Sequence, residues 1–318
     1  MLVLKDKILI NIKRKISVSL VLVLAGLMGV TSASYFNNAN AYAYTLLDSK
    51  LSTKRISQHM QPLFLIAQGH STYDNIYSVF GDGNLQTPDC AHDEFGPHIT
   101  EEWDNVLGKY AFVFHIHAEE DNDQCIRSDR QRTEIKASTS SPETLKGFLG
   151  DTVAYKWLFK LDEDFRPIRQ FTHIHQIKPF PSNDLGPTIT VSPVSGEIDR
   201  LEVRHRDSSR DRRVIASAPL DLFKGKWIEV SERLTYGPNG KYKIEFRGLK
   251  SGKLILKHKD RDIDLWPQGI QFHRPKWGIY RSLRDKEELL RDEQVLFDQI
   301  CMVKGRKTCS YLDAPELK

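Results

Sequence analysis

Apolar and polar residues alternate along most of the chain from residue 108 onward, with the period of two that β-strands show. The alternation comes in short runs that are rich in β-branched and aromatic residues and are bounded by Gly, Pro, Asn or Asp. The segment 236–240 (Y-G-P-N-G) predicts a turn between two such runs. The runs that predict strands are 109–117, 130–136, 153–161, 169–178, 188–194, 198–205, 213–218, 227–234, 242–246, 253–257, 277–282 and 295–303.

Helical patterns are few, with one candidate at residues 47–60 and a short charged one at 283–291. Many strands without alternating helices favour an antiparallel sandwich over a doubly wound fold. We therefore predict an all-β fold, a jelly-roll (concanavalin-like) antiparallel β-sandwich with few short helices. The concave face of a curved sheet in such a sandwich can hold a long polymer.

The N-terminal segment carries the whole basic excess of the chain. The 318 residues contain 46 Lys and Arg against 42 Asp and Glu, a formal net charge of +4. Residues 1–43 contain five cations and one anion, which leaves 41 of each sign in residues 44–318. Since that part is neutral, the charge gives no reason to expect nucleic acid as a partner.

The same segment has the three regions of a secretory signal peptide. A cationic start ends at Lys15, an apolar stretch spans residues 16–30, and Ala41-Tyr42-Ala43 fits a cleavage site. The apolar stretch is shorter than the roughly 20 residues of a membrane span. We expect a signal peptide at 1–43 and one domain at 44–318, secreted to the extracellular space as a monomer that is free of the membrane after cleavage.

Four cysteines would enter an oxidising compartment, where disulfides are the default. Of the three pairings that four cysteines allow, we favour the local loop Cys301–Cys309, which leaves Cys90–Cys125. A zinc site built from cysteines is the lesser alternative, because the sequence has no C-x-x-C spacing.

Three of the predicted strands carry residues suited to chemistry. The first is 130–136, where alternation places Arg130, Arg132, Glu134 and Lys136 on one face. Cations crowded on one face suit an anionic ligand, and Glu134 would hold Arg132 with its guanidinium free for a carboxylate. A solvated outer face would give the same pattern.

The second strand is 171–178, in which His173 and His175 are expected to share a face. Paired histidines suit general acid–base chemistry near neutral pH. They would also suit a metal, but the sequence identifies no third ligand. Two structural histidines are the remaining alternative.

The third strand is 276–282, in which Lys276, Gly278 and Tyr280 share one face. A glycine inside a strand often marks the close approach of a ligand or of another backbone. Tyr280 could serve as an acid or a base, or could be an ordinary amphipathic residue of the sheet.

Together, these strands supply what β-elimination on a uronic acid requires. A cation neutralises the C6 carboxylate, a His or Tyr removes the C5 proton, and Tyr returns a proton to the departing O4. The segments 132–136 (R-T-E-I-K), 173–175 (H-I-H) and 276–280 (K-W-G-I-Y) occur in the order of the R-[ST]-E-L-R, Q-I-H and K-x-G-x-Y strands of alginate lyases. The chain thus resembles the jelly-roll polysaccharide lyases, which include alginate, glucuronan and heparin lyases.

The resemblance implies a role for each matching residue. Arg132 would bind the uronate carboxylate, His175 would neutralise charge or act as base, and Tyr280 would be the acid or also the base. His173 is a further catalytic candidate. His173 stands where alginate lyases have Gln, which favours a glucuronan-like substrate over alginate. The residues expected to bind the acidic polysaccharide around them are Arg130, Glu134, Lys136, Gln176, Lys178 and Lys276.

No cofactor is expected in catalysis, although relatives of this kind can hold a structural calcium ion. Asp121 and Asp123 are the acidic loop residues that could bind it.

A second resemblance competes with the first. Residues 197–202 fit the E-x-D-x-x-E strand of laminarinase-type β-glucanases, retaining hydrolases in which Glu197 and Glu202 would be the catalytic pair. A regular strand puts these two glutamates on opposite faces, so the match requires a bulge. A non-catalytic carbohydrate-binding sandwich is the third reading, since a sandwich fold hosts many functions.

Overall fold

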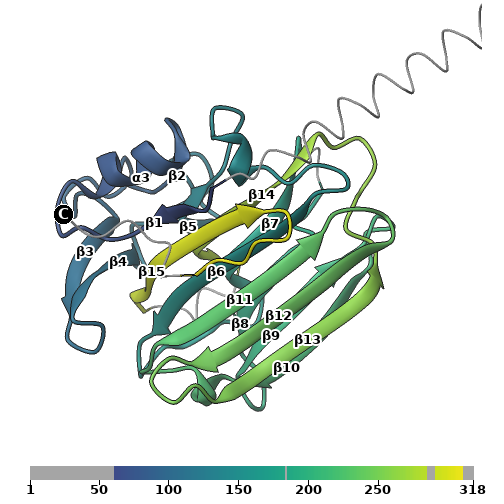
Figure 1. The fold of residues 1–318 in the computed structure, drawn as a ribbon. Helices are drawn as coiled ribbons and strands as arrows, with labels where there is room; N and C mark the ends of the chain where they lie inside the picture. The colour runs from purple at the N-terminus through teal and green to yellow at the C-terminus, as the bar shows by residue number, and fades with distance from the viewer. Residues whose placement is uncertain (1–60, 183–184, 285–290, 311–318) are drawn as a thin grey trace, which may run out of the picture. The chain divides into compact units, whose positions relative to one another are not determined.

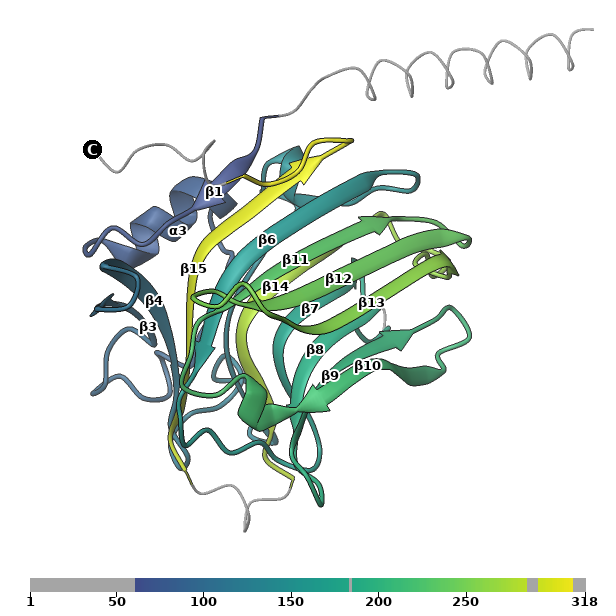
Figure 2. The same ribbon diagram turned by 60° about the horizontal axis from the view of Figure 1, so that its bottom comes forward.

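The structure, a computed structural model, describes residues 61–182, 185–284 and 291–310. The predicted signal peptide and the predicted helix at 47–60 lie outside the described residues, as do residues 285–290 of the predicted helix at 283–291. Within the described residues, strands dominate and pair antiparallel throughout. This confirms the predicted all-β sandwich, whose two layers of curved strands are visible in Figures 1 and 2.

One layer is a sheet of eight strands. Seven follow one another in hydrogen-bonded order, and the short β1 pairs with β15. In that order the strands are β13 (Leu254–Ile263), β12 (Gly240–Gly248), β11 (Ile228–Thr235), β6 (Thr152–Leu161), β15 (Glu293–Lys304), β4 (Lys109–Ile116) and β3 (Ile99–Asp104), with β1 at Leu63–Leu65.

The other layer is a sheet of seven strands, and it carries all three segments with candidate chemistry. The strands in order are β10 (Arg212–Pro219), β9 (Arg200–Arg206), β8 (Ile189–Val194), β7 (Thr172–Phe180), β14 (Phe272–Ser282), β5 (Arg130–Lys136) and β2 (Leu85–Gln86). The described helices are short: α3 (Thr72–Phe80) and the 3₁₀ turns η1 (Glu143–Leu145) and η2 (Leu220–Leu222).

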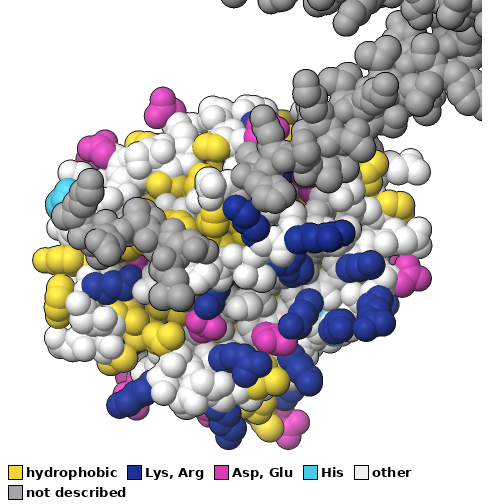
Figure 3. All heavy atoms as spheres, in the orientation of Figure 1, with side chains coloured by type: hydrophobic (Ala, Val, Ile, Leu, Met, Phe, Trp, Pro, Cys, Tyr) yellow, Lys and Arg dark blue, Asp and Glu magenta, His cyan; other side chains and the backbone are white. Residues whose placement is uncertain are grey.

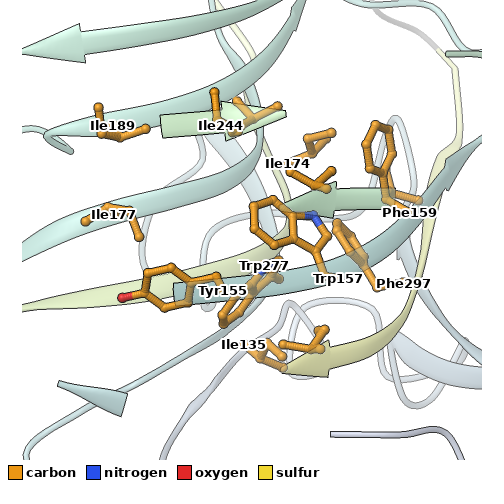
Figure 4. Close-up of a cluster of buried hydrophobic side chains, with 14 of the residues drawn as sticks. Ile135, Tyr155, Trp157, Phe159, Ile174, Ile177, Ile189, Ile244, Trp277 and Phe297 are labelled. Carbon is orange, nitrogen blue, oxygen red and sulfur yellow. The ribbon is translucent and has the colours of Figure 1, made fainter. Parts of the chain in front are cut away.

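The core lies between the two sheets, because alternate residues of each strand point inward. From the eight-stranded sheet it receives Tyr155, Trp157 and Phe159, which β6 contributes at every second position. Ile177 and Trp277 come from the seven-stranded sheet, and Figure 4 shows these side chains meeting between the layers. Burial of each such side chain contributes about 1.5–3 kcal/mol. The opposite face of the seven-stranded sheet is left for polar residues, and we call it the open face.

Both predicted disulfides are present, Cys90–Cys125 and Cys301–Cys309. The alternative of a cysteine zinc site is therefore wrong, because all four thiols are used. Over the described part of the chain, no helix is both long and apolar enough to span a membrane.

Cations are unevenly spread over the surface. Figure 3 shows Lys and Arg side chains gathered over the part of the molecule where Figure 1 places β12 and β13. Exposed members of this group are Lys241 and Lys243 on β12, with Lys257 and Lys259 on β13. These lysines lie on the eight-stranded sheet. Cations therefore occur on this sheet as well as on the three strands with candidate chemistry, β5, β7 and β14.

Candidate active site

Strands β5 and β14 are direct neighbours and bring two of the three segments together. Their register is regular, with Arg132 opposite Tyr280, Glu134 opposite Gly278, and Lys136 opposite Lys276. Because residues opposite one another project to the same side of a sheet, the predicted charged face of β5 and the Lys276–Tyr280 face of β14 form one surface.

Tyr280 lies at the centre of this surface. Its phenol oxygen accepts a hydrogen bond from Nη1 of Arg130 at 2.8 Å. The guanidinium carbon of Arg132 stands 3.8 Å from the centre of its ring, a cation–π contact. The rings of Phe171 and His173 lie 4.9 and 6.1 Å away, centre to centre. The hydrogen bond from Arg130 stabilises negative charge that develops on the phenol oxygen.

Arg132 is held by the protein on several sides. Its Nε lies 3.0 Å from a carboxylate oxygen of Asp123, and its Nη1 donates to Gln86 at 3.1 Å. Glu134 is more distant, at 3.5 Å from Nη1. Glu134 thus contacts Arg132 as expected, although Asp123 and Gln86 lie closer to its guanidinium. The role of Arg132 in binding a uronate carboxylate stays a prediction. Arg132 is 7% exposed and supports the Tyr280 ring.

Glu134 joins all three strands from a fully buried position. It accepts hydrogen bonds from Lys276 on β14 and from Gln176 on β7. Burial alone would raise the pKa of this carboxyl, but the charges of Lys276 and Arg132 hold it below its usual value. Glu134, Gln176 and Lys276 thus form a buried polar network beneath the site.

The third segment departs from its predicted geometry. The register of β7 against β14 shifts between two pairs, His175 with Trp277 and His173 with Tyr280. Three residues of β14 therefore span two of β7, so the regular alternation assumed for β7 fails there. Because of this irregularity, His173 and His175 do not share a face.

His175 points into the core. Its ring is fully buried and lies 4.4 Å from that of Trp157 and 5.0 Å from that of Trp277, centre to centre. Its Nε2 is 3.0 Å from a carboxylate oxygen of Glu232. The implied contact between His175 and substrate is therefore wrong. Gln176 and Lys178 take the place on the open face instead, so 176–178 (Q-I-K) fits the Q-I-H motif better than 173–175 does.

His173 remains on the open face beside Tyr280. Its Nδ1 lies 2.8 Å from the hydroxyl of Ser192, which itself donates to Thr190. Nδ1 therefore carries the proton, and the lone pair stays on Nε2. Burial, together with the cations Arg204 and Arg212, lowers the pKa of His173 to about 3, so the ring is neutral near pH 7.

A cavity of about 290 Å³ opens beside Tyr280 and His173, lined by β5, β7, β8, β9, β10 and β14. Five cations line it, and among the described residues no Asp or Glu does. These cations are Arg130, Lys178, Arg204, Arg206 and Arg212. A cavity lined by charges of one sign concentrates the electrostatic field and so attracts a ligand of the opposite charge, here an anion.

Two lysines that were predicted to bind substrate, Lys136 and Lys178, are partly buried, which destabilises their charged forms. Burial and the nearby Arg132 lower the pKa of Lys178 to about 8. The pKa of Lys136 is also lowered, by burial and by Arg274. Lys178 lines the cavity, whereas Lys276 lies beneath it on Glu134. An anion in the cavity would stabilise the charged form of Lys178.

Three arginines of the cavity, Arg204, Arg206 and Arg212, were not singled out from the sequence, nor was Gln86. Asp123 was considered only for calcium, and its contact with Arg132 was not foreseen. The alternation of β9 puts Arg204 and Arg206 on one face and is the signal that could have found them.

The glucanase pattern does not form its catalytic strand. Strand β9 begins at Arg200, and Glu197 lies in the turn before it. The pairing of β9 with β8 is regular, without the bulge that the match requires. Glu202 is also engaged, at 2.6 Å from Nε of Arg204. The two glutamates therefore do not meet as a catalytic pair.

The two acids considered for calcium have different partners. Asp121 contacts three histidines, whereas Asp123 contacts Arg132. They do not converge on one site.

Comparison with known proteins places this geometry in context. A family model described as polysaccharide lyase matches residues 92–301, more than half of the chain. No curated protein matches the sequence.

Solved structures are similar to this chain at low identity, and one with a TM-score above 0.5 shows the same fold. Alginate lyase Aly36B, solved in complex with an alginate trisaccharide, is 10% identical, with a TM-score of 0.52 over 77% of this chain and 99% of that one. The endo-β-1,4-glucuronan lyase of the fungus Trichoderma reesei is 17% identical, with a TM-score of 0.47 over 68% and 88%. The alginate lyase of Aplysia kurodai is 10% identical, with a TM-score of 0.49 over 78% and 100%.

Proposed function

Because the chain belongs to the polysaccharide lyase family, we propose that it cleaves a 4-linked uronic-acid polymer of the glucuronan type, within the chain, by β-elimination. The observation that carries the proposal is the cavity beside Tyr280, lined by five cations and, among the described residues, by no carboxylate. A polymer with a carboxylate on each sugar matches such a lining.

In the proposed reaction, cations of the cavity neutralise the C6 carboxylate and so acidify the C5 proton. Arg204 and Lys178 both line the cavity and are suited to this role. Arg132, which its protein partners hold, keeps the Tyr280 ring in place.

Tyr280 carries both proton transfers in this scheme. Its phenolate, stabilised by the hydrogen bond from Arg130, takes the proton from C5. The electron pair of the C–H bond forms the C4–C5 double bond as the C4–O4 bond breaks, and the phenol returns its proton to O4. Each turnover leaves Tyr280 as it began and gives one unsaturated end and one new chain end.

His173 serves as a contact residue. With a pKa of about 3 it holds a proton too weakly to store one near neutral pH. Its Nε2 lone pair can accept a hydrogen bond from a sugar hydroxyl. We assign it to orienting the sugar ring.

We also propose that the protein is secreted. The signal-like segment 1–43 and the two disulfides support export to an oxidising compartment.

A panel of purified polymers tests the substrate. Glucuronan, alginate, a heparin-type polymer and a neutral β-glucan are each incubated with the protein, and kcat/KM is measured from the formation of new reducing ends, with unsaturated ends followed in parallel. We expect glucuronan to give the highest value and the β-glucan to give none. Preference for alginate would overturn the choice of polymer, and cleavage of the β-glucan would overturn the class of substrate.

A further inference from the structure

Four side chains converge away from the cavity. They are His92, His98, His117 and Asp121, and one nitrogen or oxygen atom of each lies within 4.8 Å of all the others. His98 and Asp121 are buried, while His92 and His117 are partly exposed. They come from two segments: residues 92–98 precede β3, and residues 117–121 join β4 to β5.

The spacing of these atoms fits a tetrahedral metal site. Nδ1 of His92, Nε2 of His98 and Nδ1 of His117 lie 3.1, 3.0 and 3.2 Å from oxygens of Asp121. Ligands at about 2.0–2.1 Å from a zinc ion stand about 3.3 Å apart in a tetrahedron. The three separations from Asp121, two to Oδ1 and one to Oδ2, are close to that edge length, and the four ligand atoms all lie within 4.8 Å of one another.

The far nitrogens of two histidines have the partners that metal ligands have. Nδ1 of His98 lies 2.8 Å from a carboxylate oxygen of Asp89, and Nε2 of His92 lies 2.7 Å from one of Glu120. A carboxylate on the second ring nitrogen fixes the tautomer and strengthens a histidine as a ligand.

We propose that His92, His98, His117 and Asp121 bind one zinc ion. Three imidazoles and one carboxylate suit zinc rather than calcium or magnesium, which prefer all-oxygen sites. Four protein ligands complete the tetrahedron and leave no open position for substrate, so the ion is structural. The ring of Phe95 lies 4.2 Å from that of His117, centre to centre, and covers one side of the cluster.

The ion would join the two segments beside the candidate active site. The disulfide Cys90–Cys125 links the same two regions of the chain. Two residues after Asp121, Asp123 contacts Arg132, which in turn supports Tyr280. The zinc ion thus strengthens the segment that positions Arg132.

Metal analysis of the full-length protein tests the proposal directly. Protein stripped with a chelator is titrated with Zn²⁺, and with Co²⁺ as a coloured probe whose visible absorption is intense in tetrahedral sites. We expect one equivalent of each, a tetrahedral cobalt spectrum, and a higher Tm with zinc. Absence of stoichiometric zinc binding by the folded wild-type protein would overturn the proposal and leave a hydrogen-bonded histidine cluster.

Variants locate the ion. His92→Gln and His117→Gln should weaken Zn²⁺ binding at least about 100-fold, since each loses one of four ligands. His115→Gln is the matched control: this neighbouring histidine bonds to Thr100 and is not among the four. Circular dichroism verifies the fold of each variant. Zinc binding that survives in both ligand variants, or that is lost in the control alone, would contradict the assignment.

Discussion

At the scale of residues, the chemistry is set by what surrounds each side chain more than by its type. Tyr280 has Arg130 on its oxygen and Arg132 over its ring, so both charges act on one phenol. His173 and His175, two positions apart, have opposite surroundings: one lines the cavity and the other lies between tryptophans.

This contrast gives a matched pair of substitutions. His173→Ala should lower kcat/KM about tenfold, the value of one hydrogen bond of about 1.4 kcal/mol, with little change in stability. His175→Ala should lower the free energy of unfolding by about 2–5 kcal/mol, because it opens a cavity and leaves Glu232 without its imidazole partner. Urea unfolding and steady-state kinetics on both variants check this. The reverse result, in which His175→Ala loses activity and His173→Ala loses stability, would show that His175 acts in the active site.

Lys178 should make substrate binding depend on pH. Its pKa of about 8, lowered by burial and Arg132, means that it loses its positive charge as the pH rises through that value. KM for an acidic polymer should therefore rise above pH 8. Lys178→Arg, which stays charged, should remove this rise, and Lys178→Met should raise KM at pH 7 and flatten the profile. A Met variant with the wild-type profile would show that another group titrates.

At the scale of elements, the irregular pairing of β7 with β14 decides which face each residue takes. Alternation in the sequence was sufficient for β5 and β14, whose register is regular, and it placed Arg130 and Tyr280 correctly. It failed for β7, because the register shift leaves no mark in the pattern of residue types. The histidines that meet Asp121 from a separate loop, His92 and His98, were missed because only the folded topology makes them its neighbours.

Gly278 is the glycine on which this arrangement depends. Its φ of +139° is one that other residues rarely adopt, and an added Cβ would lie 2.1 Å from the carbonyl oxygen of Thr133 on β5. The predicted close approach is therefore that of a neighbouring backbone.

Gly278→Ala should lower the free energy of unfolding by about 2–5 kcal/mol, since it combines backbone strain with a clash. The matched control is Gly269→Ala, where φ is +79° and nothing lies within 4 Å of an added Cβ, so only strain of about 1 kcal/mol applies. Urea denaturation of both variants measures the difference. Equal losses of unfolding free energy in the two variants would mean that β5 shifts to accommodate the extra methyl group and would contradict the predicted clash.

At the scale of the whole molecule, the fold and the enzyme family were predictable, whereas the site was predictable only in part. Periodicity and the scarcity of helical patterns determined the sandwich, because they reflect burial over many residues at once. The balance of charges in residues 44–318 excluded a net positive charge spread over the whole surface. The structure shows that cations are instead concentrated locally, in the cavity and over β12 and β13. The cavity itself draws on six strands that are distant in sequence, so its shape could not be read from the chain.

The ultraviolet absorbance of the C4–C5 double bond, followed while the protein acts on glucuronan, tests β-elimination through Tyr280 most directly. We predict that absorbance grows with wild-type protein and that Tyr280→Phe slows it by about 10²–10⁴-fold, while binding of the polymer is retained. New reducing ends without the absorbance, or a Tyr280→Phe variant that works at the wild-type rate, would contradict β-elimination through Tyr280.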